Sequence, residues 1–327
     1  MSVPEIDVII PVYNGEMYLE RAVLSAVRQS LPPARILICD DGSTDATPAI
    51  AQRLSQRYPQ VEHLRLRHGG EGAARNSGIA VSTAPYIAFL DADDVWFPEK
   101  LEKLAAIMES SDDHTGAVYS LYTFIDEFDN EICDEVRVPT ADGDIFDILL
   151  YKGNILPGSP SVVMVRRSVL ENVGPFDERL FNGADWDMWL RIAAVCRFEY
   201  VSEILVYIRI HANSIQRRHM DGKQIRFFMQ HLLIYDKWTD RIRRSPEFVK
   251  LLRKRALLLM LPYVFQPSRI ESFYNQIMSN SEKIGQIILG RRRDLWRGLL
   301  EMLARYGLWR LRRGLMNDQR PFLDVSG

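Results

Sequence analysis

The sequence predicts an α/β domain with a parallel sheet, followed by a helical region. Between residues 6 and 90, short apolar runs alternate four times with segments of helical periodicity. The runs lack polar alternation, which is typical of strands buried on both faces. From residue 215 the pattern is helical almost throughout. We therefore expect a domain over residues 1–214 and a helical region over 215–327.

The first half of the domain is the most regular part. Asn14 is placed to cap the first helix, whose apolar positions include Leu19 and Val23. Pro32 ends this helix because proline lacks a backbone donor. A capping cluster at residues 40–45 precedes the second helix, and the glycine-rich residues 68–72 precede the third. The expected strands are 6–12, 35–39, 61–67 and 86–90, and the second helix is 46–58.

The second half is less regular. A helix is expected from Pro98 to about Ser110, and the segment that starts at Asp185 predicts a helix to about Cys196. In the helical region, breaks are expected near Pro246, Pro262 and Pro267. Further strands are expected over 116–124, 131–138, 161–165 and 198–210.

Charge is divided unequally along the chain. Residues 1–214 contain 18 basic and 33 acidic residues, whereas residues 215–327 contain 23 basic and 10 acidic residues, which suggests an anionic partner for the helical region. The three cysteines, Cys39, Cys133 and Cys196, lack metal-ligand spacing and suit a reducing compartment. The N-terminus lacks the basic segment of a signal peptide, and no apolar run approaches the ~18 residues of a spanning helix. We expect a cytoplasmic protein.

An acidic cluster directly follows the strand at 86–90. Asp91, Asp93 and Asp94 crowd this end, which is costly unless a cation shares the site. A divalent ion held by one or two carboxylates and by substrate phosphates would fit. The alternative is an acidic, solvated helix cap before Pro98.

Three other features face the same edge of the expected sheet, where ligands of parallel α/β folds bind. Asp41 could accept a hydrogen bond from a nucleobase imide, or cap the next helix. The loop with Gly69, Gly70 and Gly72 could cradle a phosphate, although its spacing fits neither the P-loop nor the Rossmann fingerprint, or be merely flexible. Arg75, one turn into the next helix, could reach a diphosphate.

The segment around Asp185 offers a candidate base. A carboxylate within reach of a hydroxyl can take its proton in the transition state. An aspartate in a first helical turn is also common as electrostatic capping. Trp96, Trp186 and Trp189 could stack on sugar faces, or be core residues.

Five motifs occur in order and together resemble the family 2 glycosyltransferases of the GT-A fold, of the type that builds bacterial surface polysaccharides. They cover about two thirds of the chain. The motifs are Val8 to Asn14, Cys39 to Asp45, Gly72 to Gly78, Phe89 to Asp94, and Asp185 to Arg191.

The resemblance implies a Rossmann-like mixed sheet flanked by helices and a nucleotide-diphospho-sugar donor, with UDP- or dTDP-sugars favoured. Asp91 and Asp93 would form the D-x-D pair at the ribose and at a diphosphate bound to Mg²⁺ or Mn²⁺, and Asp185 would be the base of an inverting displacement. Ala184 departs from the family, in which many members have Glu before this aspartate. The residues implied around the nucleotide are Pro11, Tyr13, Asp41 and Arg75.

The end of the helical region has an amphipathic pattern with a mainly basic polar face. Such a helix could lie on an anionic membrane surface, at the inner face of the cell membrane, or pack on the acidic domain or in a homodimer. The polar positions are Arg293, Arg297, Glu301 and Arg305, the apolar positions are Trp296, Leu299, Leu300 and Leu303, and Arg310, Arg312 and Arg313 flank Trp309.

We expect a metal-dependent, inverting glycosyltransferase acting on a glycan or lipid-linked saccharide. A catalytically silent nucleotide-sugar-binding or scaffold protein of the same fold is one alternative. A sugar-phosphate nucleotidyltransferase is another, but residues 11–15 lack its glycine-rich, basic triphosphate loop. A nucleic-acid partner is not expected, because the aromatic residues form no stacking platform.

Overall fold

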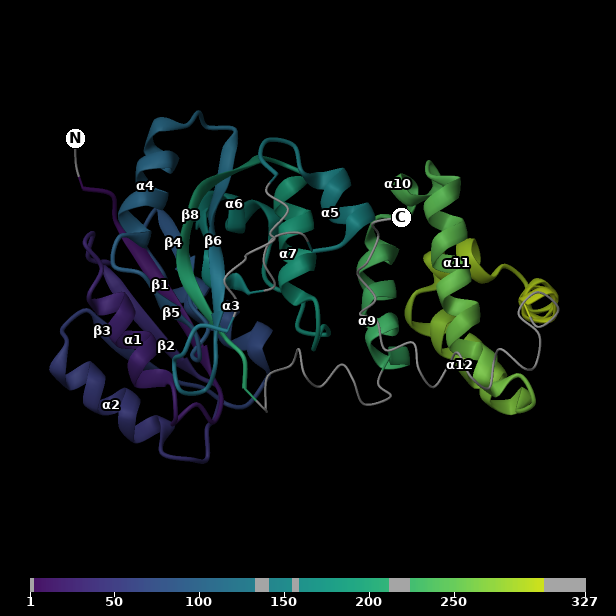
Figure 1. Cartoon of the computed structure of the whole chain (residues 1–327), viewed down its shortest axis with the longest axis horizontal. Helices are drawn as coiled ribbons and strands as arrows, with labels where there is room; N and C mark the ends of the chain where they lie inside the picture. Colours follow the sequence, from purple (N-terminus) through teal and green to yellow (C-terminus); the bar gives the residue numbers. More distant parts are fainter. Residues whose placement is uncertain (1–2, 133–140, 155–158, 212–223, 303–327) are drawn as a thin grey trace. The chain divides into compact units, whose positions relative to one another are not determined.

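The computed structural model describes residues 3–132, 141–154, 159–211 and 224–302. The chain divides into two compact units, Met1–Ser214 and Ile215–Gly327, which we call the N-terminal unit and the helical unit (Figure 1).

The N-terminal unit is built on one eight-stranded sheet in the order β3-β2-β1-β4-β7-β6-β8-β5. The first four strands along the chain pair in parallel, as their apolar sequences predict. β7 runs antiparallel to β4 and β6, and β5 runs antiparallel to β8, so the sheet is mixed. The strands are β1 (Ile6–Val12), β2 (Arg35–Asp40), β3 (Val61–Arg65), β4 (Tyr86–Phe89), β5 (Val95–Trp96), β6 (Thr115–Ile125), β7 (Val163–Arg166) and β8 (Arg197–Arg209).

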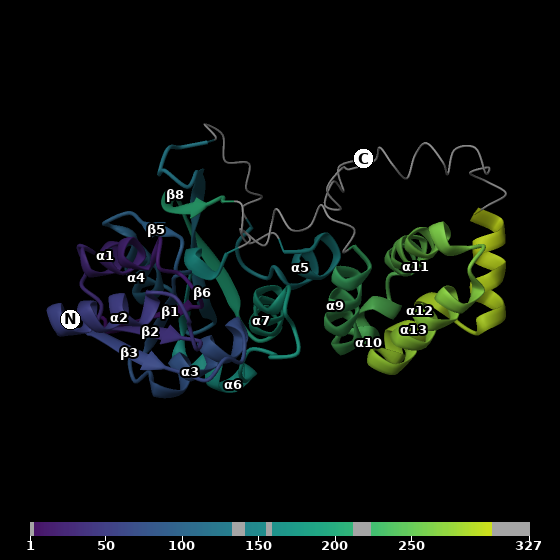
Figure 2. The ribbon, with the colours of Figure 1, turned by 90° about the horizontal axis from the view of Figure 1, so that it is seen from below.

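Helices flank both faces of this sheet. The chain moves from β1 to β2 to β3 in one direction and then returns to β4, so right-handed crossovers place α1 and α2 on one face and α3 on the other. Figure 2 shows this arrangement from below. The helices are α1 (Leu19–Val27), α2 (Thr47–Arg57), α3 (Glu71–Val81), α4 (Lys100–Ser110), α5 (Phe146–Lys152), α6 (Arg167–Val173) and α7 (Ala184–Ala193), with a 3₁₀ turn η1 (Pro160–Val162).

The three tryptophans considered above belong to the core. Trp189 is fully buried, and Trp96 and Trp186 are nearly so. The Trp96 indole donates to the carbonyl of Ser161 at 2.8 Å, and the Trp186 indole donates to the carbonyl of Leu149 at 2.9 Å. Their ring faces are therefore used for packing rather than for sugar stacking.

Three local expectations need correction. Asn14 does not cap α1: its backbone has φ 51°, and its Oδ1 accepts from the Thr44 N–H at 2.8 Å, so it joins the loops after β1 and β2. The segment 198–210 was expected to form more than one strand, but its residues up to Arg209 belong to a single long strand, β8. Of the strand expected over 131–138, Glu131 forms an isolated bridge with Ile125, and residues 133–138 lie outside the described residues.

A buried lysine at the start of α4 is a destabilising feature. Lys100 is fully buried, and its Nζ lies 4.4 Å from the centre of the Trp96 ring, with no hydrogen-bond partner in the part of the chain that the structure describes. Burial lowers the pKa of this amine well below its ordinary value of 10.5. The ring favours a cation, but an ammonium without an acceptor is costly, so we take the buried amine as neutral.

Lys100→Met is expected to stabilise the protein by about 1–3 kcal/mol near neutral pH, because methionine fills a similar volume without a desolvated amine. With a folded pKa below the unfolded value, Lys100 lowers stability most below its folded pKa, and this cost fades as pH rises towards 10.5. Urea unfolding at pH 7 and pH 10 measures the gain. Lys103→Met, in the same helix at a half-exposed site, is the control. A variant less stable than wild type at pH 7 would contradict the expectation.

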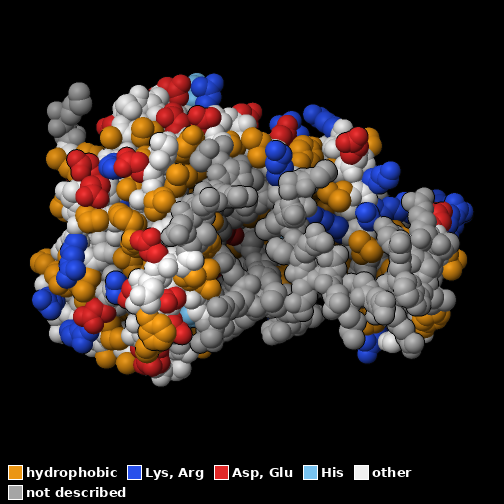
Figure 3. All heavy atoms as spheres, viewed as in Figure 1, with side chains coloured by type: hydrophobic (Ala, Val, Ile, Leu, Met, Phe, Trp, Pro, Cys, Tyr) orange, Lys and Arg blue, Asp and Glu red, His pale blue; other side chains and the backbone are white. Residues whose placement is uncertain are grey.

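The first described helix of the helical unit is α9, and prolines stand where two of the later helices begin. Pro246 and Pro267 occupy the first positions of α11 and α12, which proline tolerates because those N–H groups are unused. Pro262 lies in a 3₁₀ turn, η2 (Leu261–Tyr263). Lys and Arg side chains are prominent on the visible face of the helical unit (Figure 3). The helices are α9 (Gln224–Lys237), α10 (Thr239–Arg243), α11 (Pro246–Met260), α12 (Pro267–Asn280) and α13 (Glu282–Leu289), with a further helix over 292–302.

The helix over 292–302 packs within its own unit. Leu295 and Leu299 are buried, and Gly298 faces Leu257 of α11 so closely that an added Cβ would lie 3.0 Å from it. Leu300, expected on the apolar face, is 62% exposed instead. The described half of the amphipathic segment therefore buries its apolar face by packing; Leu303, Arg305, Trp309, Arg310, Arg312 and Arg313 lie outside the described residues. Among the described helices, none is long and apolar enough to cross a bilayer.

Candidate active site

The loops that follow β1 and β2 are tied together at the carboxyl edge of the parallel strands. The N–H of Asn14 donates to Ser43 Oγ at 2.9 Å, and the N–H of Gly15 donates to Thr47 Oγ1 at 2.8 Å. Pro11 itself is buried in β1, where it pairs with Cys39 of β2. These bonds set the position of Tyr13 beside the end of β2.

Asp41 anchors the glycine-rich loop. Its two carboxylate oxygens accept from the N–H groups of Gly69 at 2.7 Å and Gly70 at 2.9 Å, and its side chain is almost fully buried. His68 Nδ1 lies 2.9 Å from Asp41 Oδ2. The carboxylate therefore fixes the residues before α3 and does not cap α2. It also occupies the N–H groups of Gly69 and Gly70, which belong to the loop predicted as a possible phosphate cradle.

An exposed aromatic pair lies next to Asp41. The rings of Tyr13 and His68 are 4.3 Å apart at an interplanar angle of 31°. Tyr13 is 49% exposed, and the His68 side chain is 58% exposed. Two accessible flat rings at the carboxyl edge of a parallel sheet offer a surface on which a planar ligand could stack. His68 was missed in the sequence, where it was only part of a glycine-rich loop.

Arg75 of α3 is a buried cation that links two of the motifs. Its guanidinium is 2% exposed and binds Glu71, one turn earlier, and Asp91 Oδ1 at 2.7 Å. Burial by itself would lower the pKa of Arg75, but the charges of Glu71 and Asp91 raise it above its ordinary value. Arg75 therefore fixes the position of Asp91. To bind a diphosphate directly, as the sequence suggested, its guanidinium would have to face solvent, and it is buried instead.

The three carboxylates after β4 have different partners and different exposure. Asp91 Oδ2 accepts from Ser159 Oγ at 2.9 Å, opposite its bond to Arg75. Asp93, 35% exposed, places Oδ2 3.1 Å from Nε2 of His211. Asp94 is buried against Ser159 and accepts from the N–H of Arg209 at 3.0 Å. Asp94 is therefore structural, and Asp93 is the most accessible of the three.

Burial also governs the protonation of Asp94. Desolvation raises the pKa of this carboxyl well above its ordinary value, and the charges of Asp93 and Asp91 add to the effect. The Ser159 hydroxyl lies 2.9 Å from Asp91 Oδ2 and 2.8 Å from Asp94 Oδ2, but it has only one proton to donate. If Asp94 is protonated, its carboxyl O–H donates to the Ser159 oxygen, and the Ser159 hydroxyl donates its one proton to Asp91.

Asp185 lies in the first turn of α7, as expected, and the positive charge of Arg75 acts on it too. Burial raises the pKa of its carboxyl, the Trp186 N–H and the Arg75 charge oppose this, and the Asp91 charge adds to it. Asn154 Nδ2 donates to Asp185 Oδ2 at 2.9 Å. The structure thus brings Arg75, Asp91 and Asp185 into one electrostatic group, although they lie on three separate segments.

The donor atoms around Asp93 allow a test of the expected metal. Among the described residues no three His, Cys, Asp or Glu side chains form a ready cage. The carboxylate of Asp93 suits Mg²⁺ or Mn²⁺ when phosphate oxygens complete the shell, and the imidazole of His211 beside it adds a nitrogen donor that suits Mn²⁺ better than Mg²⁺. The residues fit a metal that binds together with a diphosphate. His211 had only one signal in the sequence, its position directly after an expected strand.

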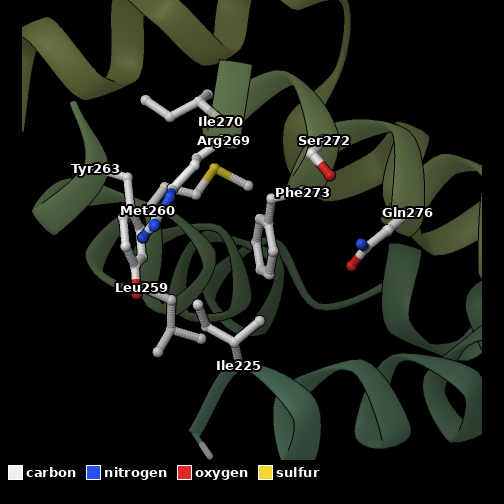
Figure 4. Close-up of a pocket in the computed structure, with 9 residues that line it drawn as sticks. All are labelled: Ile225, Leu259, Met260, Tyr263, Arg269, Ile270, Ser272, Phe273 and Gln276. Carbon is white, nitrogen blue, oxygen red and sulfur yellow. The ribbon is translucent and has the colours of Figure 1, made fainter. Parts of the chain in front are cut away.

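A separate cavity of about 210 Å³ lies in the helical unit (Figure 4). Arg269 at its edge has its guanidinium 5.3 Å from the centre of the Tyr263 ring. None of its described lining residues carries a carboxylate, so we place no transfer chemistry there. Its lining residues are Ile225, Leu259, Met260, Tyr263, Arg269, Ile270, Ser272, Phe273 and Gln276.

The mixed sheet, the flanking helices and the carboxylate-rich edge define a protein of the GT-A fold. The family model "Glycosyl transferase family 2" matches residues 7–174, about half of the chain, and the chain belongs to this family. Four of the five motifs fall wholly inside this match, and the Asp185 motif lies beyond it.

Several known proteins are similar to this chain. An uncharacterized glycosyltransferase of Nostoc sp. (strain PCC 7120) is 34% identical over 216 residues, 63% of this chain and 65% of the relative. A chondroitin synthase of Escherichia coli is 27% identical over 219 residues, 67% of this chain and 31% of the relative. The chain thus spans about 65% of the length of the first relatives and less of the synthase.

Solved structures share the fold. S. aureus TarS (residues 1–349), in complex with UDP-GlcNAc, has a TM-score of 0.64 at 18% identity, over 93% of this chain and 92% of that chain. The mannosyltransferase PcManGT from Pyrobaculum calidifontis, in complex with GDP-Man and Mn²⁺, has a TM-score of 0.52 at 16% identity, over 96% of this chain and 84% of that chain.

Proposed function

We propose that this protein is a metal-dependent, inverting glycosyltransferase that moves a sugar from a nucleotide-diphospho-sugar to a hydroxyl of a glycan or lipid-linked saccharide. The observation that carries the proposal is the shared cation: Arg75 binds Asp91 and acts on Asp185. Family membership supports the reaction class. Chondroitin synthase among the relatives supports a role in building cell-surface polysaccharide.

The donor's nucleobase would lie at the aromatic pair of Tyr13 and His68, with Pro11 and Asp41 behind it. Stacking on exposed rings contributes about 1–3 kcal/mol per base. Asp41 would act mainly by fixing the loop that carries His68, because its oxygens already accept from that loop. A UDP- or dTDP-sugar is our preferred donor, and the UDP-GlcNAc complex of the TarS structure supports this choice.

The diphosphate would lie near Asp91 and Asp93. Asp93, together with His211, would hold Mg²⁺ or Mn²⁺, and Asp91, positioned by Arg75, would face the ribose and complete the D-x-D pair. When bound, such a metal neutralises the charge that develops on the leaving diphosphate. The Mn²⁺ complex of PcManGT supports a divalent metal.

Asp185 would be the general base. The acceptor oxygen attacks the anomeric carbon from the side opposite the diphosphate, its proton passes to the Asp185 carboxylate, and the electron pair of the broken C–O bond leaves with the diphosphate. Attack from the opposite side inverts the anomeric centre. The raised pKa of Asp185 makes its carboxylate a better proton acceptor at neutral pH than an ordinary aspartate.

A thermal-shift screen with nucleotide diphosphates and nucleotide sugars, followed by detection of released nucleotide, tests the proposal. We expect UDP to raise the melting temperature more with Mn²⁺ than with EDTA, because a ligand of the folded state stabilises it. Asp93→Ala should remove the difference between Mn²⁺ and EDTA. Asp113→Ala, at an exposed carboxylate, is the control. Binding without any sugar transfer or hydrolysis would favour the catalytically silent alternative.

For the helical unit we propose contact with an anionic membrane surface, at the cytoplasmic face, where a lipid-linked acceptor would be found. Arg293 and Arg297 are exposed on the helix over 292–302, whose Leu295 and Leu299 are already buried, so the attraction would be mainly electrostatic. Flotation with phosphatidylglycerol vesicles, compared with phosphatidylcholine vesicles, tests this. Equal recovery of wild type and of Arg293→Glu/Arg297→Glu would exclude it.

A further inference from the structure

Asn154 makes a side-chain contact that neither the family match nor the proposed reaction assigns. It lies in the loop after α5, whereas Asp185 lies at the start of α7. Its Nδ2 donates to Asp185 Oδ2 at 2.9 Å. Its Oδ1 is buried and has no partner among the described residues. Among the described residues, the hydrogen bond to the Asp185 carboxylate is therefore what orients this amide.

The local backbone places Asn154 there. Gly153 ends α5 with φ 91° and ψ −167°, a conformation open to glycine and strained for other residues. The Trp186 indole donates to the carbonyl of Leu149 at 2.9 Å, which fixes α7 against α5. A glycine turn on one side and an interhelix hydrogen bond on the other therefore set the distance from Asn154 to Asp185.

We propose that Asn154 is a positioning residue for the base of the transfer reaction: its amide N–H fixes the plane of the Asp185 carboxylate and keeps it in the proton-accepting form. This inference rests on the proposed function. A donor N–H at Oδ2 stabilises the charged carboxylate and directs its remaining lone pairs. A protonated Asp185 would instead need an acceptor at that place.

Other charges also act on Asp185. Arg75 of α3 favours the carboxylate, whereas Asp91 after β4 and Glu71 at the start of α3 disfavour it. Burial raises the pKa of Asp185 above its ordinary value of 3.8. The amide of Asn154 therefore opposes burial from the side of α5, as Arg75 does from the side of α3.

Two substitutions distinguish a role in positioning the Asp185 carboxylate from a purely structural contact between α5 and α7. Asn154→Ala should lower kcat about tenfold to a hundredfold at neutral pH and move the acid limb of kcat/KM to higher pH, because the carboxylate loses its donor. Asn154→Asp should move the limb further, since two carboxyl groups so close cannot both ionise. UDP binding, measured by thermal shift, should stay at the wild-type value in both.

The matched control is Asn130→Ala. Asn130 Nδ2 also donates to an aspartate, Asp126 Oδ2, at 3.0 Å, on the turn after β6. Its removal should leave the acid limb at the wild-type pH. A fall in kcat for Asn154→Ala with an unmoved acid limb, or wild-type kcat and limb, would overturn the proposal.

A second measurement does not depend on turnover. Carboxyl ¹³C titration of aspartate-labelled protein, with the Asp185 signal assigned by its loss in Asp185→Asn, should show a higher pKa in Asn154→Ala than in wild type. If the wild type transfers no sugar, the proposed function fails, yet this titration still decides whether Asn154 holds the carboxylate. An unchanged Asp185 titration would overturn the inference.

Discussion

Asp185→Asn is expected to lower kcat by about 10²- to 10⁴-fold, the usual contribution of a general base. Asparagine has nearly the same shape, so α7 keeps its first turn, but an amide cannot take the proton of the acceptor hydroxyl. Donor binding should persist, because the residues placed around the nucleotide and metal lie on other segments. Transfer assays with the donor found in the screen, together with the UDP thermal shift, measure the two effects separately.

Two features make this test of Asp185 clear. The substitution removes a negative charge from a buried group that Asp91 already crowds, so stability should not fall, and a loss of kcat cannot be attributed to unfolding. Asp177→Asn, which alters an aspartate paired with Arg179 in the loop before α7, is the matched control and should keep near wild-type turnover. Near wild-type turnover in Asp185→Asn itself would refute its role as the base.

The N-terminal half of the sheet could be predicted because its signals are local. β1, β2 and β4 are apolar runs that need no partner to be recognised, and each is followed by turn and helix signals. The end of each parallel strand must lie at the same edge. This is why Asp41 and Asp91 could be assigned to the same edge of the sheet from sequence alone.

The rest could not be predicted because it depends on pairing through space. β6 and β8 are neighbours in parallel although about seventy residues separate them, and irregular segments between them carry no register signal. From the sequence, Asp41 was predicted to bind a nucleobase or to cap a helix. In the structure its carboxylate accepts hydrogen bonds from the N–H groups of Gly69 and Gly70. The same carboxylate chemistry suits all three partners.

The candidate site shows the same division. Asp93 and Asp185 were identified by motif, but their immediate partners, His211 and Asn154, were not. A single histidine or asparagine has no spacing or periodicity from which a role can be read. Such residues become visible only when the fold places them within 3.1 Å of a carboxylate.

Arg75→Met is expected to be the most destabilising single change in the site, by about 1.5–3 kcal/mol, the usual contribution of charged hydrogen bonds, because the guanidinium is buried whereas its two carboxylate partners are partly exposed. It leaves Asp91 and Glu71 without their cation, and Asp185 without its nearby positive charge. Urea unfolding followed by tryptophan fluorescence measures the loss. Arg53→Met is the matched control: Arg53 also binds a glutamate, Glu20, at 2.7 Å, but both side chains are exposed, so a change of about 0.2–1 kcal/mol is expected.

The pH dependence separates electrostatics from lost packing. Without Arg75, the pKa of Asp185 should rise further, because burial and the charge of Asp91 are less opposed. A carboxyl whose folded pKa lies above its unfolded value favours folding at low pH and loses that contribution as pH rises through the folded pKa. The deficit of Arg75→Met relative to wild type should therefore be largest near pH 8 and shrink towards pH 5, whereas lost contact with the Phe176 ring, 5.5 Å from the guanidinium, would cost the same at both. A deficit independent of pH would mean that Arg75 supports the fold by packing, and that the charge group linking Asp91 to Asp185 does not hold the site together.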